Sequence, residues 1–263
     1  KVGIYICQSY TQSSSKRFSN KADGTPLTQV DLYAHSMLVE GLHEICPDIP
    51  VLSEESTALE LRNRFDWGQL WIIDPLDGTR EFLNKTGDFT INIALVENGR
   101  PLLGIISQPL LEVCHVGLVG GGVWRVGSGE EIGDSLEIKT QPANKKSISI
   151  LSSRGHAGLV FDNYLNWIKT YFIEVNLLKF GAALKFIKLV DGIGDIYPRF
   201  SPCSEWDVAA GDAIVHAAGG RLVRLDGQPL KYNSREKLLS EPFIAVGACS
   251  FPLLSKSIDY FSS

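Results

Sequence analysis

The spacing of apolar residues divides the chain into helices and strands. Apolar residues recur at spacings of four and three between residues 34 and 45, which predicts a helix that begins at Thr28 or Asp31 and ends before Pro47. The first 12 residues read as the end of another helix. Short apolar runs predict strands at residues 51–52, 71–73, 89–96, 102–107, 112–119 and 123–126. Asn98-Gly99 predicts a hairpin turn, and the glycines at 120–122 predict another turn.

The order of elements changes after a polar stretch at residues 134–146. Strands are predicted at 147–151, 172–178, 195–199, 221–225 and 243–248, with helices at 159–170, 180–190, 207–218 and 251–260. This alternation is typical of an α/β protein. We therefore expect an N-terminal α+β part at residues 1–143 and a C-terminal α/β part at residues 144–263.

The segment after the predicted strand at 71–73 carries candidate chemistry. Proline donates no ladder hydrogen bond, so the strand is expected to end at Asp74-Pro75. Asp77-Gly78-Thr79 then opens a short helix whose unpaired N–H groups can hold a phosphate. The two carboxylates, three residues apart, suit a hard cation such as Mg²⁺. The alternative is that these residues are only turn formers, with Asp77 as a helix N-cap.

Four further acids have simple structural explanations when each is taken alone. Asp31 falls in the first turn of its helix, where it would interact favourably with the helix dipole. Glu54 and Glu55 follow a strand, where adjacent glutamates are usually solvated. Asp207 is predicted in a first helical turn behind Ser204, which favours helix capping.

Composition narrows the class of protein and of ligand. The 263 residues are 44% hydrophobic and 21% charged, which fits a soluble globular protein, and no apolar run is long enough for a membrane helix. We recognise no signal peptide at the start of this sequence, which begins at Lys1. Five scattered cysteines indicate a reducing compartment, so we expect a cytoplasmic protein, with peripheral association at the inner face of the cell membrane as an alternative. A net charge of −5 without a basic block argues against a nucleic acid polymer as partner but allows a small phosphorylated ligand.

These motifs together resemble a known family. Residues 53–55, residues 71–79 and the later Trp206-Asp207 occur in the order found in the inositol monophosphatase superfamily of metal-dependent phosphomonoesterases. The closer resemblance is to its 3′(2′),5′-bisphosphate nucleotidases of CysQ type, and it covers nearly the whole chain. The segments that carry this closer resemblance are residues 21–31, 51–55, 78–82, 153–156 and 197–200.

The resemblance implies a layered α/β/α/β/α sandwich and a centre of two or three Mg²⁺ ions. Glu54, Asp74 and the carbonyl of Leu76 would hold one ion, and Asp74, Asp77 and Asp207 would hold a second. By the same resemblance, Thr79 and Asp31 would activate water, with part of that role given to Glu54. Backbone N–H groups at Gly78 and Thr79 would bind the scissile phosphate.

The resemblance also implies a substrate side in the C-terminal part. Ser153 and His156 match nucleotide-contacting positions, Lys185 matches a phosphate-side lysine, and Ala182 replaces a serine of some relatives. Arg199, Lys185 and His156 are the candidates for a second-phosphate pocket, expected opposite the Asp74–Asp77 corner. Their alternatives are an exposed helix lysine, a surface histidine and a strand-end charge.

The expected activity is Mg²⁺-dependent, lithium-sensitive hydrolysis of the 3′-phosphate of adenosine 3′,5′-bisphosphate, in sulfur assimilation or nucleotide salvage. Two alternatives stay open from the sequence. One is an inositol monophosphatase-like or fructose bisphosphatase-like sugar phosphatase, and the other is a non-catalytic metal or phosphate sensor. The sequence does not indicate an oligomeric state.

Overall fold

The computed structural model describes residues 1–12, 19–20, 26–132, 136–137, 146–155 and 158–262. The predicted boundary near residue 143, residues 21–25 of the motif at 21–31 and the candidate His156 lie outside the described residues. The boundary between two parts therefore stays a prediction.

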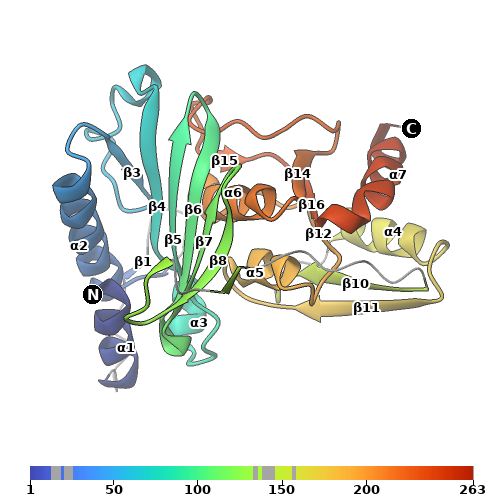
Figure 1. The fold of residues 1–263 in the computed structure, drawn as a ribbon, viewed down its shortest axis with the longest axis horizontal. Helices are drawn as coiled ribbons and strands as arrows, with labels where there is room; N and C mark the ends of the chain where they lie inside the picture. Colours follow the sequence, from blue (N-terminus) through green and yellow to red (C-terminus); the bar gives the residue numbers. More distant parts are fainter. Residues whose placement is uncertain (13–18, 21–25, 133–135, 138–145, 156–157, 263) are drawn as a thin grey trace.

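The elements stack in five layers, as expected for this fold (Figure 1). Helices α1 (Val2–Gln12) and α2 (Gln29–Ile45) lie against a seven-stranded sheet. Helices α5 (Leu184–Val190) and α6 (Ala209–Ala217) lie between that sheet and a five-stranded sheet. Helices α4 (Leu159–Ile168) and α7 (Phe251–Ser262) cover the far side. The α/β/α/β/α sandwich is confirmed.

The larger sheet comes from the N-terminal half and has the strand order β3-β4-β5-β6-β7-β8-β9. Only β3 and β4 run parallel, and every other neighbouring pair is antiparallel. The bounds are β3 (Val51–Ser53), β4 (Gln69–Asp77), β5 (Thr90–Glu97), β6 (Arg100–Gln108), β7 (Val113–Leu118), β8 (Gly122–Gly127) and β9 (Leu136–Glu137). The predicted turn at Asn98-Gly99 is confirmed, and both residues have positive φ.

The strand predicted at residues 71–73 corresponds to β4. The prediction that it ends at Asp74-Pro75 is wrong, because β4 continues to Asp77. Its neighbour β3 ends opposite Ile73, so that side of β4 requires no further ladder donors. On the other side Asp74 pairs with Asn92 and Asp77 pairs with Thr90, so three steps on β4 match two steps on β5. The strand accommodates Pro75 in a bulge.

The smaller sheet is mixed and has the order β11-β10-β12-β16-β14. Its strands are β10 (Ser147–Ser152), β11 (Glu174–Lys179), β12 (Ile196–Arg199), β14 (Arg221–Arg224) and β16 (Phe243–Val246). Strands β11, β10 and β12 run parallel, whereas β16 is antiparallel to both β12 and β14. Two short pairs complete the strands: β1 (Ser19–Asn20) with β2 (Pro26–Leu27), and β13 (Cys203–Ser204) with β15 (Leu239–Ser240). The sequence analysis did not predict either pair.

Two helix predictions need correction. The helix predicted over 180–190 begins only at Leu184, because Ala182 has a φ of 47°, which an α-helix does not allow. The helix predicted from Asp207 is divided into a 3₁₀ turn, η4 (Glu205–Asp207), and α6, which begins at Ala209. Other short helices of the described residues are α3 (Thr79–Leu83) and the 3₁₀ turns η1 (Arg64–Asp66), η2 (Pro109–Leu111) and η5 (Ala248–Ser250).

Three apolar clusters fill the spaces between the layers. One lies between α1, α2 and the outer face of the larger sheet and includes Trp71 and Ile73. The central cluster holds Ile72, Phe186 and Ile214, and so joins the inner sheet face to α5 and α6. The third packs the five-stranded sheet against α4 and α7. Ile72 therefore belongs to a different cluster from its neighbours Trp71 and Ile73, because successive strand residues face opposite sides of the sheet.

Helix α6 packs closely on the larger sheet. A Cβ built on Gly104 of β6 would lie 2.2 Å from the Ala210 carbonyl oxygen, and one on Gly117 of β7 would lie 2.7 Å from the Ile214 Cα. Both positions therefore need glycine because the helix backbone occupies the space of a side chain. This close contact places the N-terminal end of α6, and with it η4, beside the end of β4.

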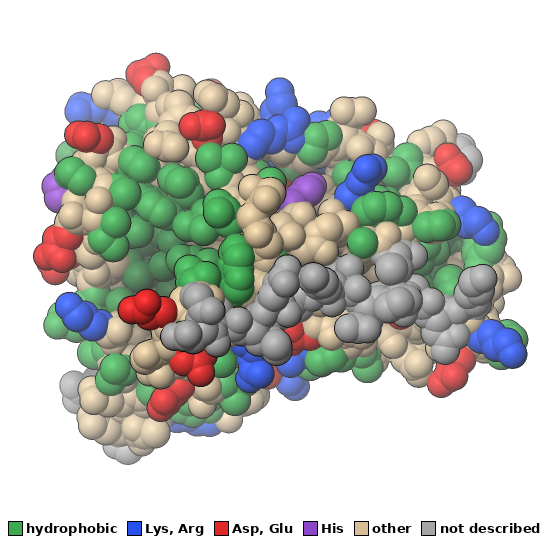
Figure 2. Space-filling view, in the orientation of Figure 1, with side chains coloured by type: hydrophobic (Ala, Val, Ile, Leu, Met, Phe, Trp, Pro, Cys, Tyr) green, Lys and Arg blue, Asp and Glu red, His purple; other side chains and the backbone are tan. Residues whose placement is uncertain are grey.

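Part of the larger sheet stays partly exposed on its outer face. Hydrophobic side chains gather over the seven-stranded sheet in the space-filling view (Figure 2). Leu118 and Val119 at the end of β7 are both more than two fifths exposed. No helix among the described residues is long and apolar enough to cross a membrane.

Candidate metal centre and substrate cavity

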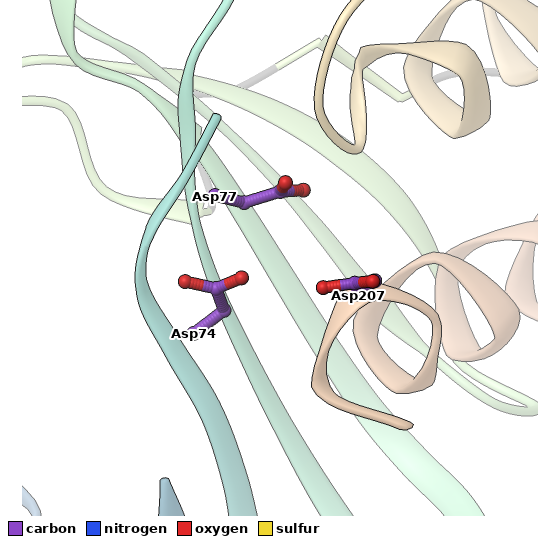
Figure 3. Close-up of side chains that lie close together, drawn as sticks. All are labelled: Asp74, Asp77 and Asp207. Atoms are coloured by element: carbon purple, nitrogen blue, oxygen red, sulfur yellow. The ribbon is translucent and has the colours of Figure 1, made fainter. Parts of the chain in front are cut away.

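Three carboxylates from distant parts of the chain converge beside the end of β4. Asp74 and Asp77 come from β4, and Asp207 comes from η4. One carboxylate oxygen of each lies within 4.8 Å of those of the other two. The three side chains point toward a common space (Figure 3). The sequence prediction that these acids form one cluster agrees with this geometry.

Each acid is oriented by a hydrogen bond to one of its oxygens. The backbone N–H of Leu76 donates to Asp74 Oδ1 over 3.0 Å. Asn92 Nδ2 donates to Asp77 Oδ2 over 3.0 Å, and the N–H of Ser204 donates to Asp207 Oδ2 over 2.9 Å. The helix-capping interpretation of Asp207 and the cluster interpretation therefore both apply.

The clustered acids hold their protons unusually tightly. Burial, reinforced by Asp77 and Glu54, raises the pKa of Asp207 from 3.8 to about 8. Burial also raises the pKa of Asp77 to about 6, against the opposing effect of Lys185. The pKa of Asp74 lies well above its usual value because of burial and the charges of Glu54 and Asp77. A divalent cation would relieve this repulsion, and carboxylate oxygens are the donors that Mg²⁺ prefers, so the residues fit the ion.

Thr79 and Asp31 form a hydrogen-bonded pair next to the acids. Thr79 Oγ1 lies 3.0 Å from Asp31 Oδ1 and 3.2 Å from the carbonyl oxygen of Leu76. The other oxygen of Asp31 accepts hydrogen bonds from the N–H and the hydroxyl of Thr28, which is the N-cap of α2. Asp31 is 2% exposed. It therefore lies in the first turn of α2, where its alternative interpretation placed it, and forms a capping box with Thr28. It also contacts the predicted water-activating threonine.

Glu54 leaves β3 beside the end of the same ladder. Its N–H donates to the carbonyl oxygen of Ile73 over 3.2 Å, which brings the residue next to Asp74. Its charge raises the pKa values of Asp74, Asp77 and Asp207. Glu54 lies outside the closest three-acid group but in the same cavity.

These residues line one cavity of about 360 Å³ between the two halves of the chain. Ten of the predicted site residues line it: Glu54, Asp74, Leu76, Asp77, Gly78, Thr79, Ser153, Lys185, Arg199 and Asp207. Asp31 stands behind Thr79, one hydrogen bond away from this lining. Other lining residues to which the sequence analysis gave no role are Arg80, Arg154, Tyr197 and Cys203. The first three lie in segments that carry the closer resemblance, which is the signal that could have identified them.

Gly78 forms the tight turn between β4 and α3. Its φ is 92°, and an added Cβ would lie 2.7 Å from the carbonyl oxygen of Asp88. A side chain at this position would therefore be both strained and obstructed. Glycine lets the backbone N–H groups at the start of α3 line the cavity.

Lys185 is buried, not an exposed helix lysine. It is 4% exposed, and its Nζ donates to the carbonyl oxygens of Phe180, over 3.3 Å, and Ala182. Burial lowers the pKa of Lys185 to about 8, although the charge of Asp77 opposes that shift. Because Lys185 and Asp77 interact, this lysine lies toward the acid end of the cavity. The sequence analysis expected it on the opposite side, in the second-phosphate pocket.

Two arginines on the C-terminal side are held by neighbouring groups. Arg199 donates to Ser153 Oγ over 2.7 Å and to the carbonyl oxygens of Ser201 and Pro202 over 3.1 Å each. Arg154 pairs with Asp88, with Nη2 2.6 Å from Oδ2. The structure therefore joins two of the predicted residues, Arg199 and Ser153, directly.

Comparison with known proteins agrees with this geometry. Residues 1–248 match the model of the inositol monophosphatase family. The 3′(2′),5′-bisphosphate nucleotidase CysQ of Salmonella typhimurium is 38% identical over 243 residues, 92% of this chain and 94% of that protein. The protein of the same name from Buchnera aphidicola is 39% identical over 93% of this chain and 89% of its own length.

A solved structure supports the same assignment. The crystal structure of CysQ from Bacteroides thetaiotaomicron, described as a bacterial member of the inositol monophosphatase family, aligns with a TM-score of 0.79 and 34% identity. The alignment covers 94% of this chain and 93% of that one. The chain belongs to the inositol monophosphatase family.

Proposed function

We propose that this protein is a Mg²⁺-dependent 3′(2′),5′-bisphosphate nucleotidase that converts adenosine 3′,5′-bisphosphate to AMP and phosphate. The observation that carries the proposal is the convergence of Asp74, Asp77 and Asp207 on one face of a cavity that also holds buried Lys185. The similarity to CysQ nucleotidases over most of the chain supports this choice of substrate.

The acids would hold two or three Mg²⁺ ions. We assign Glu54, Asp74 and the Leu76 carbonyl to one ion, and Asp74, Asp77 and Asp207 to a second, with Asp74 shared. Bound Mg²⁺ would stabilise the charge that develops on the phosphate and lower the pKa of the attacking water.

The residues of the chain would orient the substrate and handle the proton. Thr79 Oγ1 can accept a hydrogen bond from water while it donates to Asp31 Oδ1, so the attacking water is oriented and its proton has a route to a buried carboxylate. N–H groups of Gly78 and Thr79, together with Lys185, would bind oxygens of the scissile phosphate.

The C-terminal rim would contact the nucleotide. We assign Ser153, His156 and Arg199 to that contact, and the hydrogen bond from Arg199 to Ser153 Oγ supports their joint action. His156 enters on the resemblance alone, because it lies outside the described residues. We further propose that the protein acts in the cytoplasm on a small phosphorylated nucleotide.

One assay tests the proposal against its alternatives. Phosphate release is measured with adenosine 3′,5′-bisphosphate, inositol 1-phosphate and fructose 1,6-bisphosphate, each with and without Mg²⁺. We expect Mg²⁺-dependent release with a strong preference for the nucleotide. Comparable turnover of inositol 1-phosphate would reject the nucleotidase assignment, and no release from any of them would leave a metal or phosphate sensor.

A further inference from the structure

We infer that a buried polar network behind η4 is a positioning device that holds Asp207 in the metal cluster. The network consists of Glu205, Asn233, Arg235 and Arg64, and we use "network" for these four residues below. The inference rests on the proposed Mg²⁺ centre and adds to it residues that do not contact the cavity. Its consequence is that the network sets the affinity for Mg²⁺ without taking part in the reaction.

Glu205 is the centre of the network and lies two residues before Asp207. It is fully buried, at 0% exposure, although glutamate rarely is. Its carboxylate accepts a 2.6 Å hydrogen bond from the N–H of Asn233 and lies 3.4 Å from Arg235 Nη2. Its own N–H donates to the carbonyl oxygen of Leu238 over 2.9 Å. Both its backbone and its side chain therefore bind the segment 233–238.

Arg64 fastens that segment from the other side. Arg64 Nη1 donates to Asn233 Oδ1 over 2.8 Å, and Nη2 donates to the carbonyl oxygens of Arg235 and, over 2.8 Å, Glu236. In return Asn233 Nδ2 donates to the carbonyl oxygen of Arg64 over 2.6 Å. Asn233 and Arg64 are 8% and 5% exposed. Arg64, which lies ten residues after Glu54, is thereby connected through Asn233 and Glu205 to η4, the turn that carries Asp207.

The acid cluster explains why such a fastening is needed. When deprotonated, Asp207 carries the same charge as Asp74 and Asp77, and oxygens of all three lie within 4.8 Å of one another. Like charges at this distance push η4 away from β4 when the acids are deprotonated and no cation lies between them. Among the described contacts, the ladder of β13 with β15 and the hydrogen bond of Glu205 to Asn233 oppose this movement.

A purely structural role does not explain why these buried residues are charged and polar. Burying charged groups is unfavourable unless every partner is in place, and apolar residues of similar volume often stabilise a protein equally well. Groups that orient metal ligands, in contrast, typically change metal affinity by about 10–100-fold when they are altered. The network includes Glu205, which lies in the same 3₁₀ turn as the ligand Asp207, and this position favours the second role.

The test uses Glu205→Gln, which keeps the shape and one acceptor but removes the charge that pairs with Arg235. The melting temperature of the whole protein is measured over a series of MgCl₂ concentrations in the presence of inorganic phosphate. We expect the Mg²⁺ concentration at half-maximal stabilisation to rise about tenfold or more. The Mg²⁺ dependence of nucleotide hydrolysis should shift by a similar factor, while kcat at saturating Mg²⁺ falls much less.

Two further variants make the test specific. Glu241→Gln removes the other acidic partner of Arg235, which lies 2.9 Å from Nη1 and is 34% exposed, without touching η4. Its Mg²⁺ midpoint should match that of the parent. Asn233→Gly removes the link to Arg64 but suits the φ of 52° at this position, so it tests the network even where Glu205→Gln does not fold. We expect it to raise the Mg²⁺ midpoint in the same direction.

The outcomes separate the inference from the proposed function. Lower melting temperatures with unchanged Mg²⁺ midpoints in Glu205→Gln and Asn233→Gly would overturn the inference and leave the nucleotidase proposal intact. An equal midpoint shift in Glu241→Gln would also overturn it. If the Mg²⁺ midpoints shift in Glu205→Gln and Asn233→Gly but the parent protein releases no phosphate from nucleotides, the inference is supported and the proposed function is rejected.

Discussion

Replacing Asp207 with asparagine should have opposite effects on stability with and without metal. Burial and neighbouring carboxylates raise the pKa of Asp207, so the folded protein binds its proton more tightly than the unfolded chain does. Deprotonation therefore destabilises the metal-free fold as pH rises from about 4 to about 8. The asparagine of the variant would lack this ionisation, and its amide oxygen can still accept the N–H of Ser204.

The size of the effect follows from the shift. A rise from 3.8 to about 8 corresponds to at most about 6 kcal/mol, at 1.36 kcal/mol per pKa unit. Asp207 faces the cavity, where water screens its charge, so we expect about 2–3 kcal/mol near pH 9. For a chain of this size that is a rise in melting temperature of about 5–10 °C for metal-free Asp207→Asn.

The assay is thermal melting by circular dichroism with a chelator and with millimolar MgCl₂. At about pH 4.5 the metal-free parent and variant should melt at similar temperatures, because Asp207 is protonated. Near pH 9 the variant should melt higher without metal, whereas Mg²⁺ should stabilise the parent more than the variant. A metal-free variant that melts at or below the parent at every pH would refute the reasoning.

Four further results are expected. Asp77→Asn should reduce Mg²⁺-dependent phosphate release at least about a hundredfold at saturating Mg²⁺, because one ion contributes several kcal/mol and about 1.4 kcal/mol is tenfold in rate; activity within a few-fold of the parent would remove Asp77 from the ligands. Li⁺ should inhibit at sub-millimolar to millimolar concentrations, as the family resemblance implies, and inhibition no stronger than that by Na⁺ would contradict a replaceable Mg²⁺ site. Arg199→Ala should lower kcat/KM for adenosine 3′,5′-bisphosphate by about 10–100-fold but change 3′-AMP hydrolysis little, since a hydrogen bond to a charged group contributes roughly 1.5–3 kcal/mol; equal losses would mean that Arg199 supports the loop whose carbonyls it binds. Gly104→Ala should destabilise the protein in a denaturant titration by about 1–3 kcal/mol, because its Cβ would overlap the Ala210 carbonyl, while Gly41→Ala, with open space around its Cβ, should not.

The sequence was sufficient for features that depend on neighbouring residues. One stretch of six positions contains Asp74, Asp77, Gly78 and Thr79. A strand, a turn and a short helix were predicted from the residues of this stretch and its immediate neighbours. The alternation of helical and strand periods indicated only an α/β protein, and the five-layer sandwich was expected from the resemblance to a family. The resemblance to a family then added distant Asp207, whose own pattern indicated only a helix cap.

The sequence was insufficient wherever the environment comes from elsewhere in the chain. The burial of Lys185 depends on the Phe180–Ala182 turn, whose positive φ at Ala182 no apolar spacing predicts. Glu205 and Asn233 are separated by 28 positions and Arg64 and Asn233 by 169, so only the fold brings them together. Pro75 misled the prediction, because a strand that has lost one neighbour can tolerate it.

Because of the bulge in β4, the neighbouring strand β5 helps to determine on which side of the sheet Asp74 and Asp77 lie. In a regular strand, acids three residues apart face opposite sides of the sheet. Asp74 and Asp77 share a side because each stands opposite a residue of β5, Asn92 or Thr90, and those two lie an even number of positions apart. The arrangement is therefore specified by the polar pair on the neighbouring strand as much as by the acids. A related protein could change the number of residues between its two acids by one and keep both on the same side, provided that it kept this pair.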